Sequence, residues 1–130
     1  MVRVRSLQGM RLHVETPTGN LFIDRRDDGT EELRPVDLLV ASLGGCMLGT
    51  MLEVAKARGI DPGAVSIDLE PKLASRPLRV ESIDISLCIP PDVDEKTADE
   101  LLRIAKHCKI HNTLQRPPST EVTLRRIAAV

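Results

Sequence analysis

Aromatic side chains are almost absent from this chain. Phe22 is the only one among 130 residues, and there is neither Trp nor Tyr. Because proteins that bind single-stranded nucleic acid stack bases on aromatic rings, this mode of binding is nearly excluded. The formal net charge of −1, with 28% charged residues, describes a surface of mixed sign rather than the basic patch that attracts DNA or an anionic membrane. We therefore expect neither a nucleic-acid nor a membrane partner.

We also expect neither a targeting signal nor a long apolar run in this sequence. Residues 1–6 (MVRVRS) do not form the apolar run of a signal peptide, and we expect no stretch to approach the roughly 20 residues of a membrane-spanning helix. Three cysteines without an export signal are typical of the reducing cytosol, where disulfides are transient or catalytic. These features predict a cytoplasmic protein. With no repeat or linker, residues 1–130 are expected to form a single domain with an aliphatic core.

Alternation of apolar and polar residues predicts strands in several places. Residues 10–14 alternate, residues 21–23 continue that sheet, and the charged segment 24–34 is expected to be an exposed loop. Residues 65–70 and 78–89 also alternate, and a change of parity near Glu81 and Ser82 predicts a β-bulge. Cys88 lies on the polar side of its strand and is set apart from any thiol pair in the core. A last strand is expected over residues 121–127.

Two long helices are expected between these strands. The first runs from Val36 to Arg58 and is apolar nearly all round, which is typical of a buried helix. The second follows the capping-box spacing of Asp92 and Glu95, and it carries Cys108 on its apolar face. The element order β-β-β-α-β-β-α-β predicts an α+β fold, with the helices packed on antiparallel sheet.

Two cysteines, Cys46 and Cys108, lie in these helices and could form a reactive pair. A thiol attacks only as a thiolate, and burial raises its pKa, so Cys46 would need a cation or hydrogen-bond donors from another segment. Cys108 is expected near the C-terminal end of its helix, where the dipole disfavours a thiolate. This favours Cys46 as the attacking thiol and Cys108 as the thiol that condenses with it. Free cysteines are also common as small buried hydrophobes, and that interpretation stays open.

A zinc site is a further alternative. Cys108 and His111 are three residues apart, His107 is adjacent, and Cys46 could complete a set of sulfur and nitrogen ligands. Against this, the sequence has neither a CxxC nor an HExxH motif, and histidines near a helix C-terminus commonly interact with the dipole.

Residues 34–46 (RPVDLLVASLGGC), followed later by residues 105–114 (AKHCKIHNTL), resemble the OsmC/Ohr family of osmotically inducible and organic-hydroperoxide-resistance proteins, in particular its OsmC-like subfamilies. The resemblance covers essentially the whole chain, because the order of strands and helices also agrees. It implies an intertwined homodimer, with antiparallel sheets around two long central helices and both active sites at the subunit interface. It also implies reduction of organic hydroperoxides or hydrogen peroxide, with Cys46 in the peroxidatic position and Cys108 in the resolving one. No metal or organic cofactor is expected, and an external dithiol would recycle the disulfide.

The same resemblance raises a question about the residues around the thiols. Active relatives use an arginine from an N-terminal strand or loop to stabilise the thiolate, and an acidic residue near the start of the first helix to orient that arginine. Asp37 matches the acidic residue, but its spacing puts it about 180° round the helix from Cys46. Arg34, Arg11 and Arg25 are all candidates for the arginine. A non-enzymatic OsmC-like binding or structural dimer that lacks the activating arginine is therefore the alternative function.

Overall fold

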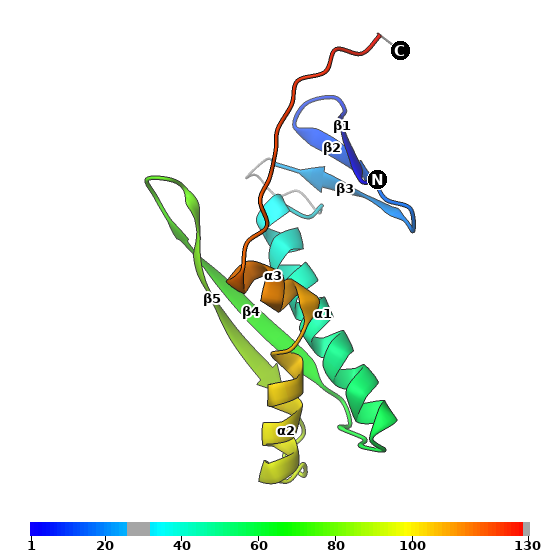
Figure 1. Cartoon of the computed structure of the whole chain (residues 1–130), viewed down its shortest axis with the longest axis vertical. Coiled ribbons are helices and arrows are strands. Elements are labelled where there is room, and N and C mark those ends of the chain that lie inside the picture. Colours follow the sequence, from blue (N-terminus) through cyan, green and yellow to red (C-terminus); the bar gives the residue numbers. More distant parts are fainter. Residues whose placement is uncertain (26–31, 129–130) are drawn as a thin grey trace.

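The computed structural model describes residues 1–25 and 32–128, and in these ranges the chain forms two antiparallel sheets and three helices (Figure 1). The N-terminal sheet lies at one end of the long axis and the second helix at the other. The elements are β1 (Arg3–Ser6), β2 (Arg11–Glu15), β3 (Asn20–Asp24), α1 (Pro35–Ala57), β4 (Ser66–Ala74), β5 (Arg79–Cys88), α2 (Glu95–Ala105) and α3 (Lys109–Gln115).

The N-terminal sheet has the strand order β1-β2-β3 and contains the one aromatic ring. The ring of Phe22 stacks on His13 at a centroid distance of 4.8 Å, and the guanidinium of Arg11 lies 4.0 Å from its centroid. Asp24 was expected in an exposed loop, but it ends β3 and is buried. Residues 26–31 of the expected loop lie outside the described residues.

The second sheet is the hairpin of β4 and β5, and it contains the predicted bulge. Lys72 pairs with Ser82 and Leu73 pairs with Val80, which leaves Glu81 as the extra residue. One face of the hairpin packs on the core through partly buried side chains of Ile67, Leu69, Ile83, Ile85 and Leu87, together with Val65 just before β4. Cys88 is exposed on this hairpin, as the alternation predicted.

Helix α1 crosses the inner face of this hairpin with its predicted bounds nearly unchanged. Pro35 is its first residue, and Gly59 follows its end with a φ of +71°, a conformation that glycine adopts without strain. Its buried side chains recur at helical spacing and include Leu43, Met47, Met51 and Ala55. A Cβ on Gly44 would lie 2.6 Å from Cδ1 of Leu69, so this glycine lets the helix approach β4 closely.

The circumference of α1 is not buried all round within one chain. Leu39 and Leu52 are each 39% exposed, and only one face of the helix meets the core. At 23 residues, and with a mean hydropathy of 1.7 over its most apolar window, α1 is long and apolar enough to cross a membrane. The expectation that no stretch approaches this length was therefore wrong. Core helices of globular proteins meet the same criteria, and α1 has its buried face on β4, α2 and α3.

The expected second helix is broken into two, which changes the setting of Cys108. Helix α2 ends at Ala105, and Cys108 is the N-cap of α3 with extended backbone angles. Cys108 therefore precedes a helix instead of ending one, and the predicted unfavourable dipole is wrong. The start of α2 also differs, since its N-cap is Asp94 and not Asp92.

The C-terminal residues 117–128 do not form the expected strand. A strand needs hydrogen bonds from a neighbouring strand, and no segment within the described ranges pairs with residues 121–127. This tail runs from α3 towards the end of the molecule that holds the N-terminal sheet (Figure 1). Val122, Leu124 and Ile127 are 94%, 88% and 77% exposed.

Candidate active site

Cys46 lies at the edge of the buried face of α1. It follows Leu43 by three residues and directly precedes Met47, both of which are in the core, and it is itself half-buried. Residues three apart lie about one helical turn from each other on the same face, so the Cys46 side chain points towards the elements that cover this face. Partial burial leaves the thiol accessible while it removes some of its hydration.

Cys108 lies in the core, where α1, α2 and α3 meet. Only 1% of its surface is exposed, and it packs in one cluster with Leu101, Ala105 and the buried side chains of α1. Its Sγ accepts a hydrogen bond from the backbone N–H of His111 at 3.2 Å, which is an N-cap interaction. The prediction that Cys108 points towards the core is confirmed.

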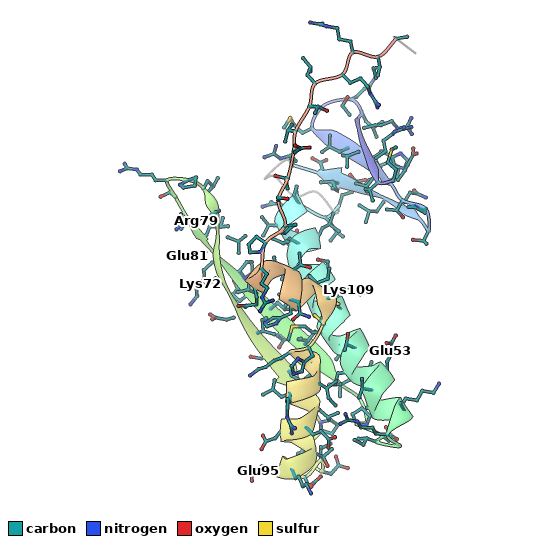
Figure 2. All side chains as sticks on the ribbon, viewed as in Figure 1. Glu53, Lys72, Arg79, Glu81, Glu95 and Lys109 are labelled. Atoms are coloured by element: carbon teal, nitrogen blue, oxygen red, sulfur yellow. The ribbon has the colours of Figure 1, made fainter. Side chains whose placement is uncertain are left out.

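The fold brings the two thiols close enough for each to shift the pKa of the other, and both are free cysteines. The pairing follows from the packing of α1 against α2 and α3, because the break between these two helices turns the chain back towards Cys46. Lys109, the first residue of α3, is labelled where this short helix lies in Figure 2. Cys88 is not part of the pair. Its thiol donates instead to Oδ2 of Asp68 at 3.6 Å.

The surroundings shift the pKa values of the two thiols in opposite directions. The backbone N–H of Ile110 is the largest cause that lowers the pKa of Cys46, and it outweighs burial with help from the Cys108 thiol, the N–H of Lys109 and the Thr50 hydroxyl. Burial raises the pKa of Cys108, and the N–H of His111 offsets this only in part. A thiolate in this pair is therefore more stable on Cys46 than on Cys108.

The predicted acidic residue, Asp37, does not join the thiols. It occupies the first turn of α1, where its Oδ2 accepts from the backbone N–H of Arg34 at 3.0 Å. This contact closes the start of the helix, which is the ordinary role of an acidic residue at that position. This contact agrees with the helical spacing, which places Asp37 on the far side of α1 from Cys46.

The candidate arginines are not among the groups that shift the pKa of Cys46 in the described part of the chain. The Nε of Arg11 donates to Glu32 at 2.9 Å, and its guanidinium covers Phe22 in the N-terminal sheet. The backbone of Arg25 continues from β3 and donates to the carbonyl of Met10 at 3.4 Å. Arg34 is the N-cap of α1, just over three turns before Cys46.

Metal binding finds no support in the residues that the structure describes. Over residues 1–25 and 32–128, no three His, Cys, Asp or Glu side chains gather closely enough to hold an ion. The arrangement considered from the sequence, with Cys46, Cys108, His107 and His111, is therefore not assembled in these ranges.

Sequence reasoning missed the donors to Cys46. Thr50 had a readable signal, since it follows Cys46 by four residues on the same helix face. The N–H groups of Lys109 and Ile110 had none, because they become free donors only through the helix break before α3.

Comparison with known proteins places this chain in a family. The family model described as OsmC-like protein matches residues 27–123. A search of curated proteins found no match.

Solved structures share the fold at low sequence identity. An OsmC-like protein from Mycoplasma pneumoniae is 19% identical with a TM-score of 0.80, covering 90% of this chain and 87% of its own. An organic hydroperoxide resistance protein from Elizabethkingia anophelis is 16% identical with a TM-score of 0.70, covering 90% and 89%. An organic hydroperoxide resistance protein OsmC from Legionella pneumophila is 23% identical with a TM-score of 0.64, covering 89% and 90%. The predicted α+β fold is confirmed, and the chain belongs to the OsmC-like family.

Proposed function

We propose that this protein is a thiol-dependent peroxidase that reduces organic hydroperoxides, with hydrogen peroxide as a second substrate. The observation that carries the proposal is the opposite pKa shift of two neighbouring thiols, lowered at Cys46 and raised at Cys108. A peroxidatic cysteine must ionise near neutral pH, whereas its resolving partner can stay protonated until it is needed. The names of the solved relatives from Elizabethkingia anophelis and Legionella pneumophila, both organic hydroperoxide resistance proteins, support the same chemistry.

The first step oxidises Cys46. Its thiolate attacks the terminal peroxide oxygen, an S–O bond forms, and the O–O bond breaks. The alkoxide leaves and takes up a proton to become the alcohol, while Cys46 becomes a sulfenic acid. The N–H groups of Ile110 and Lys109 stabilise the starting thiolate.

The second step forms the disulfide. The Cys108 thiol attacks the sulfenic sulfur, the S–S bond forms, the S–O bond breaks, and water leaves with the thiol proton. An external dithiol then supplies two electrons and two protons to regenerate both thiols. No metal or organic cofactor takes part in this cycle.

We propose further that the protein works as a homodimer in the cytoplasm. One side of α1 carries Ala41, Gly45 and Leu52 exposed to solvent, and a Cβ on Gly45 or Gly49 would touch nothing within 4 Å. Small residues at helical spacing let a second helix approach closely, and the exposed apolar side chains of the tail offer further area to a second copy. Light scattering should give twice the 14.3 kDa chain mass, and Gly45→Leu should shift the protein towards the monomer.

The test of the enzymatic function is peroxide consumption with a dithiol reductant. Cumene and t-butyl hydroperoxide should be consumed by the wild type, and Cys46→Ser should lower the rate at least a hundredfold. With a reductant too bulky to reach Cys46, Cys108→Ser should consume about one equivalent of hydroperoxide per chain and then stop. Cys88→Ser is the matched control, because its thiol is outside the pair, and it should keep the wild-type rate. Equal rates for wild type and Cys46→Ser would refute the proposal.

A non-enzymatic OsmC-like dimer is the second candidate. It is favoured by one observation, that no arginine in the described part of the chain contributes to the lowered pKa of Cys46. Mass spectrometry after mild peroxide treatment separates the two functions. A Cys46–Cys108 disulfide supports the peroxidase, whereas two unmodified thiols support a binding or structural role.

A further inference from the structure

A cavity of about 330 Å³ opens between α1, β5 and α3, and neither Cys46 nor Cys108 is among its lining residues. This volume is within the range of small-molecule sites, which have mostly apolar walls and a few polar groups. Its lining residues are Leu39, Leu43, Val80, Glu81, Ser82, Ile83, Ile85, His111, Leu114 and Gln115.

Two residues connect the cavity to the thiols. Leu43 lines it from α1 and lies one helical turn before Cys46. His111 lines it from α3, and the backbone N–H of the same residue donates to Sγ of Cys108. A molecule held in the cavity is therefore next to the residues that frame the thiol pair.

Glu81 brings a carboxylate to the rim of this cavity. It is the extra residue at the bulge of β5, it lines the cavity, and it is exposed to solvent. Glu81 lies on the same strand as Arg79 (Figure 2). It is the one carboxylate among the lining residues, and His111 is the other titratable group there.

The basic side chains close to Glu81 in the hairpin have partners of their own. The guanidinium of Arg79 donates to the carbonyl of Pro77 at 3.1 Å, and Nζ of Lys72 lies 3.0 Å from Oδ2 of Asp84. Neither residue lines the cavity. The cavity thus combines apolar walls from α1 and β5 with a carboxylate at its polar side.

We propose that this cavity holds the organic group of the hydroperoxide, and that Glu81 makes it select neutral hydroperoxides over those that carry a carboxylate. The inference rests on the proposed peroxidase function and names its substrate class. Two negative charges a few ångströms apart repel, and partial exposure to solvent reduces the effect, so we expect a preference of about three- to tenfold. His111, Ser82 and Gln115 remain available as hydrogen-bonding groups for an uncharged polar substituent.

The test compares cumene hydroperoxide with its para-carboxylate derivative, which differ only in the charge. The ratio of their kcat/KM values should favour the neutral substrate by about three- to tenfold in the wild type at low salt. Glu81→Gln should bring the ratio close to one, whereas Glu70→Gln, on β4 and outside the cavity lining, should keep the wild-type ratio. The same ratio in wild type and Glu81→Gln would overturn the role of Glu81.

A binding measurement separates this inference from the proposed function. Cumyl alcohol and its para-carboxylate are unreactive, and their binding can be followed by NMR through the methyl groups of Leu39 and Leu43. Tighter binding of the neutral alcohol, lost in Glu81→Gln, supports the cavity even if the protein consumes no t-butyl hydroperoxide, a result that would refute only the peroxidase. Shifts confined to residues outside the cavity, or no binding of either alcohol, would overturn the inference.

Discussion

Different interactions stabilise the N-terminal sheet and the rest of this molecule. The N-terminal sheet depends on polar contacts, with Arg5 paired to Glu15, Arg11 paired to Glu32, and one aromatic ring between Arg11 and His13. The body formed by the helices and the β4–β5 hairpin depends on aliphatic packing around α1. Both thiols of the pair lie in the body. Within this chain, burial and backbone N–H groups therefore control the thiol chemistry, while two of the candidate arginines, Arg11 and Arg25, belong to the other region.

The largest effect should come from the core of the body. Leu101→Ala removes a fully buried side chain and should lower the free energy of unfolding by about 2–5 kcal/mol. Leu124→Ala, in the tail where the side chain is 88% exposed, should change it by less than about 0.5 kcal/mol in the monomer. Urea titration of both variants tests the contrast. A large loss in Leu124→Ala would show that the tail is packed, for example on a second copy.

Close packing between α1 and β4 predicts the next effect. Gly44→Ala puts a methyl group 2.6 Å from Cδ1 of Leu69 and should cost about 1–3 kcal/mol of stability. Gly49→Ala, where the methyl group meets nothing of the same chain within 4 Å, should be neutral in the monomer or stabilise its helix by up to about 1 kcal/mol. Thermal unfolding of the pair measures the difference, and equal melting temperatures would mean that Leu69 moves aside at little cost.

The thiol pair should titrate in two separate steps. The pKa of Cys46 lies below the ordinary 9.0 and that of Cys108 above it, so raising the pH ionises Cys46 first. At pH 7, iodoacetamide should modify Cys46 at least about tenfold faster than Cys108. Peptide mapping after a short reaction gives both rates, with exposed Cys88 as the internal reference. Faster modification of Cys108 would contradict the assigned roles.

The same shifts predict how stability depends on pH. The lowered pKa of Cys46 adds stability as pH rises through its folded pKa, and this stability is lost as pH falls back through it. The raised pKa of Cys108 acts in the opposite sense, since its contribution is present below the unfolded pKa and is lost as pH rises through the folded one. Cys46→Ser should therefore steepen the loss of stability in alkaline solution, as measured by urea unfolding between pH 7 and 10.

The smallest effect should come from the polar contacts of the N-terminal sheet. Arg11→Ala removes a solvent-exposed ion pair and a cation–π contact, and it should lower the free energy of unfolding less than the core substitution Leu101→Ala. Because no arginine contributes to the lowered pKa of Cys46 within the described ranges, the alkylation rate of Cys46 in this variant should stay near the wild-type value. A tenfold slower alkylation of Cys46 would show that Arg11 reaches the thiol in the assembled protein. The N-terminal sheet would then take part in the thiol chemistry of the body.

Local patterns in the sequence were enough to predict much of the body. Helix α1 was predicted within one residue at each end, because Pro35 and Gly59 mark its limits. The bulge at Glu81 followed from a change of parity, since side chains in a strand alternate strictly. The inward direction of Cys108 followed from helical spacing, although the helix does not continue that far.

Three features could not be predicted from local patterns. The tail has the alternation of a strand but lacks a partner within the described chain, and alternation cannot supply one. The break before α3 has no glycine or proline to mark it, because the cap comes from the Cys108 sulfur itself. The outer face of α1 was expected to be buried because the helix is apolar nearly all round, yet within a single chain only one side is covered.

By itself, the sequence determined the α+β class, the long apolar helix with Cys46 and the presence of a second cysteine on an inward-facing position, because periodicity and turn residues act over short distances. Only the tertiary structure decided that these two thiols meet and that they differ. The N–H groups that lower the pKa of Cys46 come from Lys109 and Ile110, far along the chain, and they are available only because α3 begins there. Electrostatic effects on a thiol depend on distance in space, and that distance is set by packing.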